Sequence, residues 1–123
     1  MGTRQNHGVV TIGRQRFEDL VSTALDSVPP ELTRFMDNVV VLVEDRNDEE
    51  PDLLGMYEGI ALTERTSQYG GVLPDRIFIY RDAICAMCAS EDEVVKEVSV
   101  TVIHEIAHHF GIDDRRLHEL GWA

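Results

Sequence analysis

The chain has 123 residues, the length of one ordinary domain, of which 43% are hydrophobic and 28% are charged. Its 11 Lys and Arg residues against 23 Asp and Glu residues give a formal net charge of −12, and so acidic a surface repels the phosphates of nucleic acids. No apolar run approaches the roughly 18 residues that a membrane-spanning helix needs, and the opening residues 1–7 do not contain the apolar stretch that is typical of a secretory signal. We therefore expect a single cytoplasmic domain over residues 1–123, with a flexible start (1–12) and no nucleic-acid or membrane partner.

A helix and a strand are predicted in the first third of the chain. Apolar residues over 17–28 recur at the three- and four-residue spacing of one helical face. Pro29 and Pro30 end this helix because a proline ring donates no hydrogen bond, and Pro30 can open a short helical turn that reaches Phe35. Residues 39–43 are too short and too β-branched for an independent helix, and they predict a buried strand.

Two further strands are predicted in the middle of the chain. Residues 44–52 form a polar loop, after which the aromatic and apolar residues of 54–62 indicate a strand. A loop over 63–74, which contains glycine and proline, leads to residues 76–81, a strand of high propensity. This strand has two interpretations: at a sheet edge it could pair with an extended peptide through its main chain, and otherwise it is a core strand.

The longest predicted helix is also the most informative element. It begins after Ser90, which forms a capping box with Glu93, and it runs to Phe110, where Gly111 is the usual left-handed terminator. Valine and isoleucine cover most of its circumference, so we expect a central, buried helix in which polar side chains are costly. Residues 113–120 predict a brief final helix.

The polar residues of this helix form the pattern His104-Glu105-x-x-His108. Two positions four residues apart lie about 40° from each other around the helix axis, so both imidazoles project from one face and can share a tetrahedral metal ion. Glu105 lies beside them and can reach a water bound to that metal. The metal lowers the pKa of the water toward 7 and the carboxylate takes its proton, which is the arrangement that hydrolysis requires.

A catalytic zinc ion needs a third protein ligand. Gly111 follows His108 by three residues, and a glycine can take the positive φ that turns the chain back toward the metal. Asp114, three residues further on, is the predicted third ligand, with Asp113 as its competitor. The expected cofactor is zinc (Zn²⁺), although sites of this ligand type also bind nickel or cobalt.

The two cysteines offer an alternative. Cys85 and Cys88, followed by His104 and His108, have the spacing of a structural Cys2His2 zinc site. Such a site is closed and inert, with no open position for water, and it gives Glu105 no role. It also requires a short, self-contained finger helix, so we favour the hydrolytic interpretation and expect the cysteines to be small buried residues in a reduced compartment.

The segment around the motif resembles a known family. Residues 100–114 and 116–121 resemble the small bacterial zincin-like metallopeptidases, also called minimal zincins, and residues 54–60 and 73–81 look like further segments of that family. The resemblance implies an α+β, zincin-like fold. In such a fold a small twisted mixed β-sheet is backed by helices, and the motif helix lies under the cleft.

The same resemblance implies roles for individual residues. His104, His108 and Asp114 would be the zinc ligands and Glu105 the general base. An aspartate as third ligand is similar to the snapalysin variant of the longer zincin motif. The implied activity is zinc-dependent hydrolysis of peptide bonds in a peptide or protein substrate.

The chain departs from larger zincins in two respects. Metzincins have a methionine turn downstream of the third ligand, whereas residues 115–123 contain no methionine. We also expect no lower subdomain for the primed side of the substrate. Both departures predict a peptidase that is weak, or restricted to small or extended substrates, and they leave a non-hydrolytic metal-binding or partner-binding protein as the alternative. The oligomeric state is not predicted.

Other residues near the motif receive more general predictions. His109 lies about 140° around the helix from His104 and should miss the metal, acting as a supporting or capping group. His118 is expected at the surface, and Trp122 is expected to pack on the core. The candidates for stabilising the oxyanion, which the sequence does not rank, are Tyr57, Tyr69, Tyr80 and Arg81.

Overall fold

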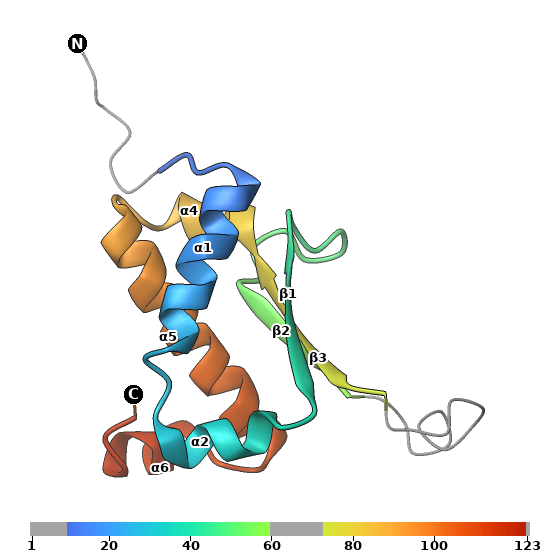
Figure 1. Ribbon diagram of the computed structural model, residues 1–123, viewed down its shortest axis with the longest axis vertical. Helices are drawn as coiled ribbons and strands as arrows, with labels where there is room; N and C mark the ends of the chain where they lie inside the picture. Colours follow the sequence, from blue (N-terminus) through green and yellow to red (C-terminus); the bar gives the residue numbers. More distant parts are fainter. Residues whose placement is uncertain (1–9, 60–72, 123) are drawn as a thin grey trace.

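The computed structural model describes residues 10–59 and 73–122, which form a three-stranded sheet with helices packed on one of its faces (Figure 1). The elements in chain order are α1 (Arg14–Leu25), α2 (Pro30–Thr33), a 3-10 turn η1 (Arg34–Met36), β1 (Val39–Glu44), β2 (Gly55–Glu58), β3 (Asp75–Tyr80), α4 (Arg81–Ala86), α5 (Glu91–His109) and α6 (Asp114–Glu119). The arrangement is α+β, as the sequence predicts. None of the helices in the described ranges is long and apolar enough to cross a membrane.

The strand order is β1-β3-β2, and the sheet is mixed. β1 pairs with β3 in parallel, and β2 pairs with β3 in antiparallel register with Gly55 opposite Ile79. β3 is therefore the central strand, so the prediction of an edge strand at residues 76–81 is wrong and its core alternative is confirmed. The strand also ends one residue earlier than predicted, because Arg81 begins α4, a helix too short to show a periodic pattern in the sequence.

β1 is less buried than predicted. Val40 is 39% exposed and Leu42 is 38% exposed, whereas Val43 is buried. The physical reason is that the helices of the described ranges cover one face of the sheet, so alternate residues of β1 face away from the core. A run of apolar residues therefore does not guarantee burial on both faces.

The core lies between the helices and the covered face of the sheet. The predicted apolar stripe of α1 is confirmed, with Phe17 and Ala24 fully buried against α5. Along α5, buried residues recur every four positions, and from β3 the alternate residues Ile77 and Ile79 complete the core. The buried residues of α5 are Val94, Val98, Thr101, Val102, Ile103, Ile106 and Ala107.

The start of α5 is capped as predicted, with one difference. Ser90 Oγ accepts a hydrogen bond from the main-chain N–H of Glu93 at 3.2 Å, but the carboxylate of Glu93 accepts from the N–H of Ala89 at 2.7 Å instead of that of Ser90. Arg16 forms a two-pronged ion pair with Glu91 and so ties α1 to this end of α5. Together these contacts fix where the long helix begins.

The parts of the chain outside the described ranges include several predicted features. Residues 1–9 of the predicted flexible start, 60–62 of the second strand and most of the predicted loop at 63–74 lie there. Within the described part, the N–H of Val10 donates to the C=O of Cys85 at 3.2 Å and Ile12 belongs to the core.

β2 and α5 approach each other closely at Gly55. A Cβ at this buried position would lie 2.7 Å from Cγ2 of Thr101 and 2.9 Å from the carbonyl oxygen of Phe78. Only glycine therefore allows the strand to lie this close to the helix.

We predict that Gly55→Ala lowers the free energy of unfolding by about 1–3 kcal/mol, because the added methyl overpacks this contact. Urea denaturation measures the change. The double variant Gly55→Ala/Thr101→Ser removes Cγ2 and should recover part of the loss, while the contact with Phe78 remains. Additive losses in the double variant would show that the two positions do not touch in the way described.

Candidate active site

The last two turns of α5 carry the residues of the motif. The imidazole rings of His104 and His108 stack with their centroids 5.7 Å apart and their planes 17° apart, so both rings lie on one face of the helix as the four-residue spacing predicts. His104 is half-buried and His108 is exposed. Both rings are therefore within reach of a ligand from outside the core.

The chain reverses directly after the motif. Gly111 has a φ of 82°, a conformation that only glycine adopts easily. Its N–H donates to the C=O of His108 at 3.2 Å, and the N–H of Ile112 donates to the C=O of Ala107 at 2.7 Å. These two bonds form a complete Schellman motif, which ends α5 and directs the following residues back along it.

The structure gives different positions to the two adjacent aspartates that follow. Asp113 is the N-cap of α6, and its carboxylate accepts from the N–H of Arg116 at 2.9 Å. Asp114 Oδ1 lies 2.9 Å from Nε2 of His108. Asp114 is thus the residue that approaches the motif, while the carboxylate of Asp113 is engaged in capping.

These donors match zinc in chemical type, because imidazole nitrogen and carboxylate oxygen are both common zinc ligands. The 2.9 Å between His108 Nε2 and Asp114 Oδ1 is close to the roughly 3.3 Å that separates two ligand atoms on one tetrahedral zinc ion. In the described part of the chain, however, no three His, Cys, Asp or Glu side chains are gathered closely enough to hold one ion. The structure therefore shows two pairwise contacts, His104 with His108 and His108 with Asp114, and a shared ion would require side-chain rotation.

Glu105 faces β2, which is one of the two edge strands of the described sheet. Its Oε1 accepts a hydrogen bond of 3.0 Å from the main-chain N–H of Tyr57 in β2. Burial raises the pKa of Glu105 above its usual value, and the hydrogen bond from Tyr57 and the nearby His108 and His104 act in the opposite direction. A carboxylate with a raised pKa is a stronger base, which suits a residue that must accept a proton from water.

Tyr57 also contacts the motif helix through its side chain, an arrangement that sequence analysis did not predict. The ring stacks on His109 at a centroid distance of 3.8 Å, and the hydroxyl donates to Oδ2 of the buried Asp75 at 2.6 Å. His109 thus supports the packing of β2 on α5. A tyrosine in a strand is too common a feature for sequence analysis to identify such a contact.

The other oxyanion candidates lie in other environments. The hydroxyl of Tyr80 accepts from Nδ2 of Asn47 at 3.1 Å, and Arg81 contacts Asp45 and the C=O of Ile12 at the far end of the sheet. Tyr69 lies outside the described residues. Of the two remaining predictions near the terminus, His118 is exposed and Trp122 packs on the core, both as expected.

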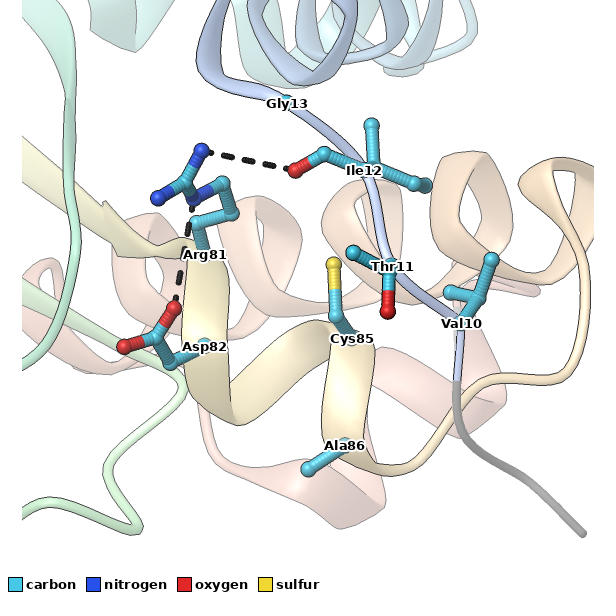
Figure 2. A pocket seen from close by; sticks show the side chains of 8 residues that line it. All are labelled: Val10, Thr11, Ile12, Gly13, Arg81, Asp82, Cys85 and Ala86. Atoms are coloured by element: carbon cyan, nitrogen blue, oxygen red, sulfur yellow. Dashed lines mark hydrogen bonds and ion pairs between the residues drawn. The ribbon is translucent and has the colours of Figure 1, made fainter. Parts of the chain in front are cut away.

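The cysteines are distant from the motif. Figure 2 shows Cys85 in the wall of a pocket of about 420 Å³ between α4 and residues 10–13. Both cysteines precede Ser90, the N-cap of α5, whereas His104 lies roughly 21 Å further along the helix from Ser90. Burial raises the pKa of the Cys85 thiol, and burial and then Glu97 and Glu93 raise that of Cys88 to about 11.

The Cys2His2 alternative is therefore wrong for the described structure. The thiols precede the first residue of α5, whereas the imidazoles lie in its last two turns, so the four side chains are too far apart to share one ion. Cys85 and Cys88 are instead small buried residues of the core.

With the fold and the site described, comparison with known proteins identifies the family. The sequence model of the zincin-like metallopeptidases matches residues 36–122, so the chain belongs to the zincin-like metallopeptidase family, and the predicted family and fold class are confirmed. No curated protein matches the chain. Among solved structures, a conserved hypothetical protein from Thermus thermophilus is similar in fold, with a TM-score of 0.52 and 24% identity over 80% of this chain and 94% of that chain.

We predict that Gly111→Ala lowers the free energy of unfolding by about 1–2 kcal/mol and also weakens zinc binding, because the residue positions Asp114. Gly121→Ala is the matched control, since Gly121 has a φ of 77° but follows α6. It should cost similar stability and leave zinc affinity unchanged. Urea denaturation and competition with a chromophoric chelator measure the two quantities, and equal zinc affinities in both variants would contradict the role of Gly111.

We further predict that Cys85→Ala/Cys88→Ala retains the zinc content of the unmodified protein. His104→Ala/His108→Ala should lose it, because the imidazoles and not the thiols are the expected donors. Elemental analysis of the purified, zinc-loaded variants tests this directly. Loss of zinc from the cysteine variant would restore the structural-site interpretation.

Proposed function

We propose that this protein is a zinc-dependent peptidase in which His104, His108 and Asp114 hold the metal and Glu105 is the general base. The observation that carries the proposal is the contact of Asp114 with Nε2 of His108. The chain reversal at Gly111 precedes this contact, and the ring of His108 lies on the same face of α5 as the ring of His104. Membership of the zincin-like metallopeptidase family supports the same class of reaction.

The metal ligands and Glu105 have different roles in the proposed reaction. Zinc, when bound, supplies a Lewis acid that polarises the peptide carbonyl and makes water more acidic. Glu105 accepts the proton of the attacking water and then delivers it to the leaving amine. Because Oε1 is held by the N–H of Tyr57, we assign the proton transfer to Oε2.

An extended peptide is the substrate that the sheet favours. β2 lies at an edge of the described sheet, and the hydrogen bond from Tyr57 to Glu105 shows that this edge faces the motif. Main-chain pairing with such an edge is a general mode of peptide recognition. The edge interaction considered for residues 76–81 is therefore proposed for β2 instead, since β3 is paired on both sides.

We expect Glu105→Gln to lower the rate of peptide cleavage by the zinc-loaded protein at least roughly 100-fold while zinc content and the urea midpoint are retained. The amide keeps an oxygen for the N–H of Tyr57 but cannot accept the proton. Mass spectrometry of a peptide library detects cleavage. Glu31→Gln, an exposed position in α2, is the control for the chemical change and should leave the rate unaltered.

The outcomes separate the candidate functions. Cleavage that persists in Glu105→Gln would remove Glu105 from the mechanism. Zinc binding by His104, His108 and Asp114 without cleavage of any library peptide would favour the non-hydrolytic alternative.

A further inference from the structure

A second pocket adjoins the candidate catalytic residues and has no role in the mechanism described so far. It has a volume of about 300 Å³ and lies between the start of β2 and the middle of α5, with His104 and Glu105 in its lining. The other residues of its wall come from 52–55 and from the preceding turns of α5. We call it the acidic pocket, because Asp52 and Glu97 line it and no Lys or Arg does.

The two carboxylates of the acidic pocket have no partner in the described parts of the chain, where neither side chain accepts a hydrogen bond or forms an ion pair. Some other surface carboxylates of the described chain are paired, such as Glu91 with Arg16 and Asp82 with Arg46, while others, such as Glu31 and Asp92, are unpaired like these two but do not line this pocket. Asp and Glu side chains are ionised at neutral pH, so the acidic pocket presents two negative charges that the protein does not neutralise.

Much of the remaining wall is apolar. Leu53, Leu54 and Val100 supply aliphatic surface in the same pocket as the two carboxylates. A lysine or arginine side chain has the complementary construction, with a methylene stem that packs on apolar surface and a charged end that reaches carboxylates. A neutral aliphatic side chain would pack on the apolar residues of the wall but would leave the carboxylates of Asp52 and Glu97 unpaired.

The position of the acidic pocket suits a residue of a bound peptide. Glu97 precedes His104 by seven residues, which places it roughly 10 Å away along the helix. An extended peptide advances about 3.3 Å per residue, so a side chain within about three residues of the scissile bond reaches this distance. The acidic pocket therefore extends from the candidate catalytic residues His104 and Glu105 to Glu97, at a distance where it could select a nearby side chain of the substrate.

We propose that the acidic pocket selects peptide substrates with a lysine or arginine side chain near the scissile bond, with Asp52 and Glu97 as the residues that determine this specificity. The proposal rests on the proposed peptidase function, because that function places a peptide between β2 and α5. Peptide hydrolysis by itself does not specify which peptides are substrates, and the proposal assigns them to the class of basic peptides.

The test measures binding separately from cleavage. Zinc-loaded Glu105→Gln protein is titrated with fluorescent peptides that differ only in one residue, lysine against norleucine, placed in turn at each position of an otherwise neutral sequence. We expect the lysine peptide to bind more tightly at one or two positions. Glu97→Gln and Asp52→Asn should each reduce that preference about two- to fivefold, as for exposed charge pairs.

The control addresses the overall charge of the protein. With a net charge of −12, any basic peptide is attracted to the surface, so Glu31→Gln removes one charge at an exposed position outside the acidic pocket. It should leave the preference unchanged. A preference that falls equally in Glu31→Gln, or is absent at every peptide position, overturns the proposal. Urea midpoints confirm that each variant is folded, and the two pocket variants test the proposal independently.

Cleavage by the protein with Glu105 intact keeps the two proposals distinct. Cleavage sites with no basic residue nearby would contradict the acidic pocket and leave the peptidase function standing. Binding of lysine peptides that depends on Asp52 and Glu97, without any cleavage, would contradict the peptidase function and support the acidic pocket as a peptide-binding site.

Discussion

The close packing of β2 on α5 determines where the functional groups lie. Gly55 permits the approach, and a few residues further on Tyr57 stacks on His109 and donates its N–H to Glu105. Burial is the principal cause of the raised pKa of Glu105, and the hydrogen bond from Tyr57 acts in the opposite direction. The environment of the base is therefore a property of the interface between strand and helix, and not of the helix alone.

The end of α5 shows how local backbone chemistry assigns roles to neighbouring residues of the same type. Asp113 and Asp114 are chemically identical, and only their order after Gly111 distinguishes them. The Schellman motif sets the direction of the chain, and the N-cap of the next helix then engages Asp113, so that Asp114 is the one directed toward His108. Two ordinary capping rules thus select the carboxylate that adjoins the motif.

Most of the fold can be predicted from the sequence because apolar periodicity and capping residues mark the helices and strands. The apolar stripe of α1, the capping residue Ser90 and the terminator Gly111 each mark a real boundary. The exposure of β1 and the central place of β3 were not predictable in this way, because both depend on which faces and edges the helices cover. α4 was missed because six residues are too few to show helical periodicity.

The candidate site was predictable only in part, for a related reason. His104, Glu105 and His108 follow from helical spacing, which is a local property. The contacts of Tyr57 with Glu105 and Asp75 join positions distant in the chain. The first uses a main-chain N–H, which every residue except proline possesses, and the second uses the side-chain hydroxyl. The acidic pocket likewise combines a loop residue with a helix residue that sequence analysis had no reason to associate.

The order of strands also bears on how the protein folds. The parallel partners Val39 and Asp75 are 36 positions apart, whereas the antiparallel partners Glu58 and Arg76 are separated by half that interval. Since the entropy lost in closing a loop increases with its length, the antiparallel pair should form first and provide the template to which β1 is added. Fraying of β1 from its outer position would then be a local event, in which the strand pair that includes β2, the partner of the candidate base Glu105, stays assembled.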